Sequence, residues 1–551
     1  MAVFRPRASL ETHEVTNQPP PFENVDLYSS DAALKGAVEA AGGRAHHPRL
    51  AKFGARCGAA ETIEWAEQAN RNPPQLKSFD RYGHRLDEVA FHPAYHKLMD
   101  LGLSAGVSAA AWRVKEAGHV LHAALLFLMN EAEAGVSCPM VMTHAVVPAL
   151  RNEPDAAKEW EPRVTAGAYD PRFIPAPEKR GATMGMAMTE KQGGSDVRAN
   201  TTRAVGIGAD DYVLTGHKWF CSAPMCDAFL TLAQTDAGLT CFLVPRFLPD
   251  GGRNALHIMR LKDKLGDRSN ASSEIEYHGA HARRVGEEGR GVRTIIDMVH
   301  HTRLDCVIGS ASGMRAALTQ ALWHAAHRNA FQKTLIDQPA MRAVLADLAL
   351  ESEAATALAI RLARAFDRAA KEPAEAAFAR LATPIAKYWI CKRQPGMVAE
   401  AMECLGGAGY VEDGVMPRHF RQSPLNAIWE GSSNVIALDI LRAITREKNS
   451  LEAARAQVAN AKGCNKFFDR HAERLDSWLE PGALGEETAR AFAEDAALAL
   501  QAAALRLYAP DFVFDGFCAA RLDLEQRSLA YGAIPAEVDQ RRVVERAFIG
   551  G

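Results

Sequence analysis

The sequence predicts an α+β protein that is mainly helical, and three observations support this. Apolar residues recur three and four positions apart before residue 180 and after residue 290, which is the spacing of amphipathic helices. Residues 181–290 instead carry short apolar runs separated by Asp- and Gly-rich turns, a pattern typical of an antiparallel barrel or sandwich. A further hundred residues continue as helical patterns. We therefore expect an N-terminal arm and helical domain (1–180), a central β domain (181–290), a helical bundle (291–445) and an extra helical domain (446–551).

Composition excludes few functions. The chain has 551 residues and a formal net charge of −3, so bulk charge favours neither a nucleic acid nor an anionic membrane as partner. The most apolar run, Val120 to Met129, is too short to span a bilayer. The first seven residues lack the apolar segment of a secretory signal. Ten cysteines without a Cys-x-x-Cys pair indicate reduced thiols, so we expect a cytoplasmic protein.

The expected elements follow from local pattern. Residues 1–30 form an irregular arm, because Pro19 to Pro21 cannot be helical. Helices are expected over Asp31–Ala41, Ala59–Asn70, His92–Leu103, Ser108–Ala134 and Met142–Leu150. Strands are expected over Met184–Thr189, Asn200–Ala204, Tyr212–His217, Phe229–Gln234, Thr240–Pro245 and Ser273–His278.

Two groups of polar residues have simple interpretations. His92 and His96 lie four apart, but Pro93 and the lack of nearby carboxylates argue against zinc, so we expect no metal site. A long helix is expected over residues 340–370, and Arg361, Arg364, Arg368 and Lys371 recur along one of its faces. A solvated face is the favoured meaning of these basic residues, with a binding patch as the alternative.

Residues 427–434 form the segment that most clearly suggests a reactive site. Glu430 lies between Trp429 and a Gly-Ser-Ser turn, directly before an apolar helical pattern. Ser432 or Ser433 is a natural N-cap for that helix, and an electron-rich ligand could lie at its N-terminus. An exposed Glu beside an ordinary capping turn is the simpler interpretation of this segment alone.

Three other segments favour a ligand site over an ordinary capping turn at Glu430: Met188 to Asp196, His217 to Ser222, and Gly406 to Tyr410. Together with residues 427–434 they resemble the flavin-binding set of the acyl-CoA dehydrogenase family. The resemblance implies a four-helix C-terminal bundle, an FAD cofactor, Glu430 as catalytic base and Arg303 close to the chemistry. It also implies cofactor contacts by Met188, Thr189, Gly194, Ser195, Trp219, Cys221, Ser222, Arg328, Phe331, Glu403, Gly406, Gly407, Trp429, Gly431, Ser432 and Asn434.

The sequence departs from the family pattern at several of these positions. Lys191 stands where the family usually has Pro, and Cys221 where most members have Thr, so that Ser222 is the nearby hydroxyl. Glu403 replaces a usual Gln and Gln332 a usual Gly. His300 replaces an acidic residue that helps hold the pantetheine arm in the family.

The reaction that the resemblance implies is α,β-dehydrogenation of an acyl thioester. Glu430 would remove the α proton, while its backbone N–H and a cofactor hydroxyl hydrogen-bond the thioester carbonyl. Arg328, Phe331, Glu403, Gly406 and Gly407 would serve the cofactor of a neighbouring subunit. This requires at least a dimer, and by resemblance a homotetramer.

A narrower resemblance covers residues 12–551, including the extra C-terminal domain. Gln18-Pro19, the Lys191-Gln192 variant and the tail are similar to the bacterial alkylation-response (AidB-type) subfamily. That subfamily implies weak dehydrogenase activity and binding of double-stranded DNA, induced when DNA is alkylated. The candidate DNA contacts are Arg442 and a basic series of Lys462, Lys466, Arg470 and Arg474, although residues 446–551 contain more acidic than basic residues.

Two alternatives remain open. One is a metabolic acyl-CoA dehydrogenase that passes electrons to electron-transferring flavoprotein. The other is a DNA-binding scaffold in which FAD is structural. Turnover with an electron acceptor and salt-sensitive binding to duplex DNA distinguish the three hypotheses.

Overall fold

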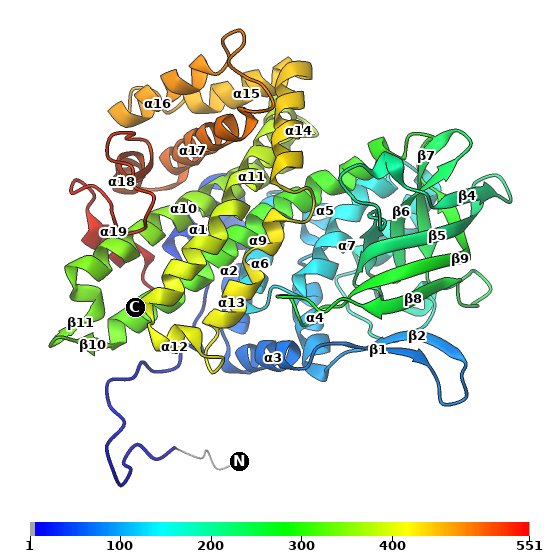
Figure 1. Ribbon diagram of the computed structural model, residues 1–551, viewed down its shortest axis with the longest axis horizontal. Helices are drawn as coiled ribbons and strands as arrows, with labels where there is room; N and C mark the ends of the chain where they lie inside the picture. The colour runs from blue at the N-terminus through cyan, green and yellow to red at the C-terminus, as the bar shows by residue number, and fades with distance from the viewer. Residues whose placement is uncertain (1–5, 550–551) are drawn as a thin grey trace.

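The computed structural model describes residues 6–549 and shows a helical body with a β domain at one end (Figure 1). Residues 6–30 form the predicted arm, whose first part extends away from the body. The N-terminal helices are α1 (Ala32–Val38), α2 (His47–Cys57), α3 (Ala60–Arg71), α4 (Pro93–Ala105), α5 (Ala110–Arg113), α6 (Gly118–Ala132), α7 (Ser137–Leu150) and α8 (Pro154–Val164).

Two features of this part differ from the sequence-based expectation. An antiparallel hairpin, β1 (Gln75–Phe79) with β2 (Arg85–Ala90), interrupts the helices and was not predicted. The single helix expected over Ser108–Ala134 is broken between α5 and α6. The break exposes the first N–H groups of α6, and the Asp367 carboxylate accepts hydrogen bonds from two of them at 2.7 and 3.1 Å. The nearly uniform apolar character of α6 hid this boundary in the sequence.

The central domain contains a closed ring of strands. Its strands are β3 (Met184–Ala187), β4 (Arg203–Gly206), β5 (Asp211–Ser222), β6 (Ala228–Thr235), β7 (Gly238–Pro245), β8 (Leu256–Leu261) and β9 (Ser272–Arg284). Pairing runs β6-β4-β5-β9-β7 and back to β6, with β3 added beside β6 and β8 beside β9. The expected antiparallel sheet is thus wrong in detail, because β3 and β4 both run parallel to β6. Strand β8 was also missed.

The C-terminal bundle is built on three long helices. It contains α9 (Gly291–His327), the hairpin β10 (Asn329–Ala330) and β11 (Lys333–Thr334), α10 (Pro339–Arg368), α11 (Pro373–Cys404), α12 (Gly407–Tyr410), α13 (Met416–Gln422) and α14 (Ser433–Arg446). Arg361 does not belong to a solvated face, which corrects the favoured interpretation. It is buried and donates to Glu375 at 2.8 Å and to Gln457 at 2.9 Å.

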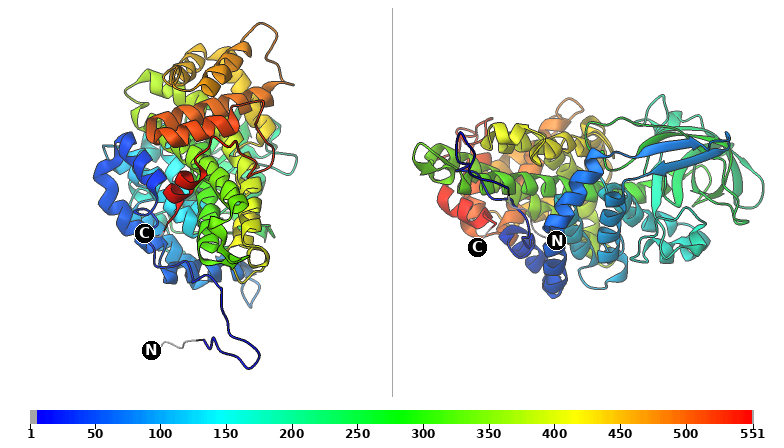
Figure 2. Two further views of the ribbon diagram at one scale, coloured as in Figure 1. Left: turned by 90° about the vertical axis from the view of Figure 1, so that its left-hand side faces the viewer. Right: turned by 90° about the horizontal axis from the view of Figure 1, so that it is seen from below.

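The last hundred residues pack directly against the bundle. They form α15 (Lys448–Ala459), α16 (Lys466–Ser477), α17 (Ala489–Tyr508), α18 (Asp511–Arg521) and α19 (Gln540–Ala547). Figure 2 shows α17 lying along the body rather than apart from it. One hydrophobic core contains residues of both parts, including Leu381 and Leu500, and Arg521 of α18 forms a buried ion pair with Glu351 of α10 at 3.0 Å. None of the described helices is both long and apolar enough to cross a membrane.

Candidate active site

Glu430 lies in the turn between α13 and α14, facing α9. Its backbone has φ 57°, a left-handed conformation that side chains other than glycine seldom adopt, and Gly431 follows with φ 102°. Ser432 occupies the N-cap position of α14, but its hydroxyl makes no capping hydrogen bond, contrary to the sequence-based expectation. A strained conformation of this kind persists only where surrounding contacts hold it.

The Glu430 carboxylate contacts one hydroxyl. Thr302 of α9 donates to Glu430 Oε2 at 2.7 Å, and its oxygen also lies 3.1 Å from the Val299 carbonyl. Burial raises the pKa of Glu430 above that of a free Glu, while the Thr302 hydrogen bond and the Lys387 and Arg303 charges oppose the rise. A carboxylate with a raised pKa in a largely dry site is suited to act as a general base.

Buried cations hold the backbone of the same turn. Arg303 Nε donates to the Glu430 carbonyl at 3.1 Å, and the Arg303 guanidinium is fixed by Asp439 at 2.7 Å. Lys387 donates to the carbonyls of Trp429, at 2.8 Å, and of Gly431. In contrast, the Glu430 N–H donates to no atom of the described chain, so it remains free for a ligand carbonyl. Arg303 was predicted near this site, but Lys387 was not.

The other predicted residues of this turn lie around it. Trp429 is half-buried and its indole N–H donates to Asn426 at 2.8 Å. Ser432 and Asn434 are exposed, and Asn434 accepts from Arg490 at 3.3 Å.

The loop after β3 and the strand β5 meet, as their predicted shared role requires. The Trp219 N–H donates to the Thr189 carbonyl at 2.8 Å. Beneath them Glu190 and Lys218 form an ion pair at 2.8 Å with fully buried side chains. Burial alone would raise the pKa of Glu190, but the Lys218 ammonium lowers it to about 2. This buried pair fixes the loop to the strand and was not singled out from the sequence.

The surface above this pair fits one half of a flavin nucleotide. The backbone at Gly194 passes so close to Thr189 that an added Cβ would lie 2.3 Å from the hydroxyl, while Ser195 is exposed beside it. Trp219 is half-buried, and the Lys262 ammonium lies 3.3 Å from the centre of its ring while it pairs with Glu274 at 2.7 Å. Exposed polar backbone and an aromatic wall are features that a flavin requires of its site.

Within this group Cys221 differs from its predicted role, and the contact predicted for Met188 stays a prediction. Cys221 is fully buried in the core of the β domain, and burial raises the pKa of its thiol to about 12. Its side chain is therefore not available to a cofactor. The pairing of β5 with β9 shifts register between Lys218 and Cys221, which breaks the alternation that would otherwise place Cys221 on the same face as Trp219. Ser222 is half-buried and offers the hydroxyl at this place, while Met188 is half-buried at the end of β3.

The remaining predicted cofactor residues lie far from Glu430. Arg328 ends the helix that carries Arg303, and 25 residues of α helix span about 37 Å. Beyond it, the hairpin turn has φ 50° at Phe331 and φ 63° at Gln332, and Phe331 is 94% exposed. Figure 1 shows β10, β11 and α12 at the end of the molecule away from the β domain. The two groups therefore cannot contact one cofactor within a single chain.

The second group is open and exposed. Glu403, Gly406 and Gly407 lie at the surface where α11 meets α12. Gly406 has φ 59° and ψ −141°, which only glycine adopts readily, and a Cβ added at Gly406 or Gly407 would meet no atom within 4 Å. Such a surface allows close approach of a ligand or a second chain.

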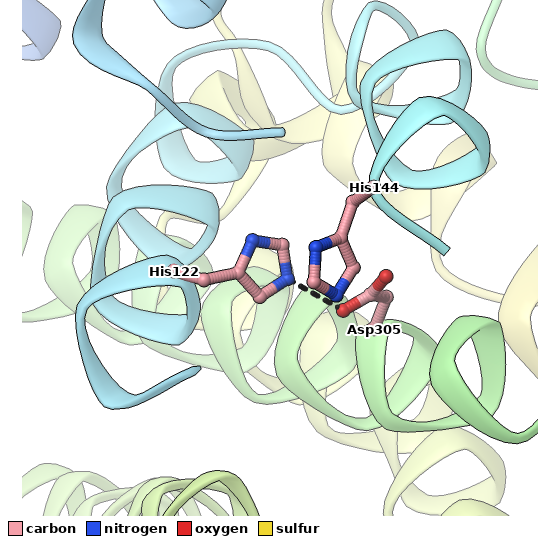
Figure 3. Close-up of side chains that lie close together, drawn as sticks. All are labelled: His122, His144 and Asp305. Carbon is pink, nitrogen blue, oxygen red and sulfur yellow. Dashed lines mark hydrogen bonds and ion pairs between the residues drawn. The ribbon is translucent and has the colours of Figure 1, made fainter. Parts of the chain in front are cut away.

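Three helices also bring together a buried cluster that the sequence did not reveal. His122 of α6, His144 of α7 and Asp305 of α9 offer ligand-type atoms within 4.8 Å of one another (Figure 3). All three lie in the described core, and neither ring nitrogen of His144 has a hydrogen-bond partner there. The sequence predicted no metal site and had considered only His92 and His96. His92 instead accepts from the Ala94 N–H in the first turn of α4, and His96 hydrogen-bonds Tyr169.

The geometry of the cluster is that of a proton-sharing pair. His122 Nδ1 lies 2.6 Å from the Val107 carbonyl, which can only accept, so this nitrogen carries a proton. His122 Nε2 lies 2.9 Å from Asp305 Oδ1, and a second proton must lie between them. Burial raises the pKa of Asp305, which lets the carboxyl keep that proton. The His144 ring stacks on His122 at 3.7 Å and 14°, so the in-plane lone pairs run side by side and do not converge on one ion.

Two of the four basic side chains of the series in the last part of the chain form ion pairs with acidic residues. Lys462 lies in the turn before α16, 3.4 Å from Asp476, and Arg474 pairs with Asp495 at 2.8 Å. Lys466 and Arg470 are exposed on α16. Arg442 is exposed on α14. The expected single stripe is therefore reduced, because acidic neighbours that are distant in sequence neutralise two of its members.

Comparisons with known proteins agree with this site. Residues 17–171 match the family described as "Adaptive response protein AidB N-terminal domain". Residues 185–280 and 289–445 match the middle and C-terminal domains of acyl-CoA dehydrogenases. The AidB protein of Escherichia coli (strain K12) is 45% identical over 516 residues, which cover 93% of this chain and 95% of that protein.

Two further relatives extend the comparison. Acyl-CoA dehydrogenase family member 11 of Caenorhabditis elegans is 32% identical over 78% of this chain and 72% of its own length. A crystal structure of ACDH-11 from C. elegans in complex with C11-CoA has a TM-score of 0.84, covering 98% of this chain and 97% of that one.

Fold and comparisons together define an acyl-CoA dehydrogenase-like flavoprotein, and the predicted fold class is confirmed. The family members are FAD-dependent flavoproteins, which confirms the predicted cofactor class. The chain belongs to the acyl-CoA dehydrogenase family, in the branch that carries the AidB N-terminal domain.

Proposed function

We propose that the protein removes the α and β hydrogens of an acyl-CoA thioester, with Glu430 as the base. The observation that carries the proposal is the Glu430 turn, where a carboxylate with a raised pKa and an unused backbone N–H belong to the same residue. A base must reach the α carbon while a donor holds the carbonyl next to it, and one residue supplies both groups.

The residues around Glu430 support the proton transfer. Ionised Glu430 accepts a hydrogen bond from the Thr302 hydroxyl, with 2.7 Å between the two oxygen atoms. After it takes the α proton, the new carboxylic acid can donate to Thr302, whose hydroxyl then turns to the Val299 carbonyl at 3.1 Å. Bound FAD would supply the hydride acceptor for the β hydrogen, with Met188, Thr189, Ser195, Trp219 and Ser222 as its holding residues.

We propose further that the cofactor site is shared between subunits. Arg328, Phe331, Glu403, Gly406 and Gly407 would complete the site of a neighbour. Arg328 lies about 37 Å along α9 from Arg303, and Glu403 lies about 24 Å along α11 from Lys387, so neither end is near the Glu430 turn of its own chain. The 94% exposure of Phe331 supports a contact with another chain or its ligand. A homotetramer, and at least a dimer, is the expected assembly.

A second function, in the response to DNA alkylation, rests on a surface near α14. Arg442, Arg446 and Lys448 are exposed at the junction of α14 and α15. Arg446 and Lys448 line an open cleft of about 610 Å³, together with Arg380, whose guanidinium pairs with Asp439 and Glu447. We propose that this junction and Lys466 and Arg470 of α16 contact duplex DNA through its phosphates. Binding would depend on the number of phosphates neutralised, not on sequence.

The dehydrogenase proposal is tested by mixing purified, FAD-loaded protein with acyl-CoAs of increasing chain length without oxygen. C11-CoA, which occurs in the C. elegans relative's structure, is a suitable starting compound. We expect loss of the oxidised flavin absorbance together with formation of the 2-enoyl-CoA. If no acyl-CoA reduces the flavin but the protein binds DNA in a salt-sensitive way, the result favours a DNA-binding scaffold with structural FAD. Transfer of electrons to electron-transferring flavoprotein, without DNA binding, would favour the metabolic enzyme.

A further inference from the structure

Three successive carbonyls of the active-site turn all point at buried cations. The carbonyls of Trp429 and Gly431 accept from the Lys387 ammonium, and the Glu430 carbonyl between them accepts from Arg303 Nε. Lys387 comes from the middle of α11, and Arg303 comes from α9. Side chains from two helices of the bundle thus hold this turn by its carbonyls. The Glu430 N–H points away from Lys387, because it lies opposite the Trp429 carbonyl in the same trans peptide.

Lys387 differs from Arg303 in having no acidic partner. Its side chain is 1% exposed, and among the described residues no carboxylate lies within ion-pair distance of it. Arg303 is instead held by Asp439 at 2.7 Å. A buried ammonium that meets only carbonyl oxygens keeps most of its field, since no neighbouring anion cancels it. This charge lowers the pKa of Glu430, as do the Thr302 hydrogen bond and Arg303. The Lys387 charge also lowers the pKa of the buried thiols of Cys306 and Cys391.

We propose that Lys387 is a positioning residue for the dehydrogenation, a role that rests on the proposed function of Glu430. By binding the carbonyls on either side, Lys387 holds Glu430 at φ 57° and turns its N–H away from the protein and toward the substrate carbonyl. The same charge lowers the pKa of the buried carboxylate and so favours its ionised form. One side chain, outside contact with the substrate, therefore sets both the orientation and the charge of the base.

Three substitutions separate these two effects from a general role in folding. Lys387→Met removes both hydrogen bonds and the charge. Lys387→Gln keeps an amide that can donate to carbonyls but removes the charge, and Lys387→Arg keeps the charge. Lys392→Met is the matched control, since Lys392 lies on the same helix and its ammonium is directed to Tyr388, with its nitrogen 5.6 Å from the ring centre. FAD content and thermal unfolding identify any variant that fails to fold.

The first measurement does not need turnover. The FAD-loaded protein is labelled with ¹³C at the Glu carboxyl carbons, and the Glu430 signal is assigned by its absence in Glu430→Gln. We expect the pKa of Glu430 to rise by about one unit in Lys387→Met and Lys387→Gln, because an opposite charge nearby is lost. It should stay unchanged in Lys392→Met and change less in Lys387→Arg. An unchanged pKa in folded Lys387→Gln overturns the electrostatic role.

The second measurement separates geometry from charge during the reaction. With an acyl-CoA that reduces the wild-type flavin, kcat should fall about 100-fold in Lys387→Met with KM changed less than about three-fold. Lys387→Arg should recover most of kcat. Wild-type kcat in folded Lys387→Met overturns the positioning role. If no acyl-CoA is turned over by the wild type, the proposed function fails, but the titration still decides whether Lys387 controls the charge of Glu430.

Discussion

The two ends of α9 show two different ways of building half a site. At the Arg303 end, the Glu430 turn is held by buried hydrogen bonds from Thr302, Arg303 and Lys387, all from the same chain. At the Arg328 end, the hairpin turn and the glycines after α11 are exposed. The first half is pre-organised before any ligand arrives, whereas the second is unfinished within one chain. On the proposed shared site, the geometry of the reaction would be set within one chain, while retention of the cofactor would depend on assembly.

The largest expected effect tests the pre-organised end. Glu430→Gln keeps the size of the side chain but removes the base, so flavin reduction by acyl-CoA should fall by about 100- to 10,000-fold. FAD content should stay at the wild-type level, because the change removes no proposed cofactor contact. Anaerobic stopped-flow absorbance measures the rate, and the flavin spectrum measures the content. Wild-type rates in the variant would place the base on another residue.

A smaller effect is expected from the hydroxyl that contacts this base. Thr302→Val keeps the shape but removes the hydrogen bond to Glu430 Oε2, which should lower kcat by about ten-fold. That hydrogen bond lowers the pKa of Glu430, so its loss raises the pKa further. Because the base acts when ionised, the acid limb of the kcat profile should move to higher pH. If the acid limb of Thr302→Val stays at the wild-type pH, Thr302 does not influence the ionisation of the base.

The unfinished end should respond differently. Gly406→Ala forces φ 59° on a residue with a Cβ, and we expect FAD affinity to fall about ten-fold with little change in the rate of the FAD-loaded fraction. Gly482→Ala is the control, since Gly482 has φ 84° in an equally open turn far from either half-site. Isothermal titration of the FAD-free protein and light scattering measure affinity and assembly. Full FAD occupancy in a stable monomer would contradict a shared site.

The smallest expected effect concerns the DNA surface, outside both ends of α9. Lys466→Ala with Arg470→Ala should weaken duplex binding a few-fold and reduce the salt slope by about two, one for each lost phosphate contact. Lys462→Ala should change binding less, because Asp476 already neutralises that ammonium. Fluorescence anisotropy at several salt concentrations measures both. Truncation at residue 445 is unsuitable as a test, because it would expose the core shared with α17. Equal slopes in all variants would remove α16 from the DNA proposal.

The parts of this site that the sequence could predict are those whose residues are close together in the sequence. Glu430 and its turn were found because the residues that define them are consecutive. Lys387 lies on another helix and looks like any other helical lysine, so only the fold shows that it meets two carbonyls of the turn. The same holds for His122 and Asp305, which pair across 183 positions.

The errors in the fold have the same origin. Arg361 shares its helical spacing with the half-buried Arg364 and the exposed Arg368, and only the packing of α15 and α11 buries it. The parallel pairing of β3 with β6 joins strands separated by two others in the chain, which local patterns cannot reveal. Cys221 fitted a sequence motif, but a register shift in β5 between Lys218 and Cys221 leaves its side chain in the core.

The uninterrupted length of α9 also limits how this protein can evolve. Any substitution that keeps the helix leaves the spacing of its two ends intact. Deletion of one residue between Arg303 and Arg328 would instead draw the far end in by about 1.5 Å and rotate it by about 100°. In a symmetric assembly that error would recur in every subunit, and the donated half-sites would all point the wrong way. We therefore expect related chains to tolerate many replacements in this helix but no change in its number of residues.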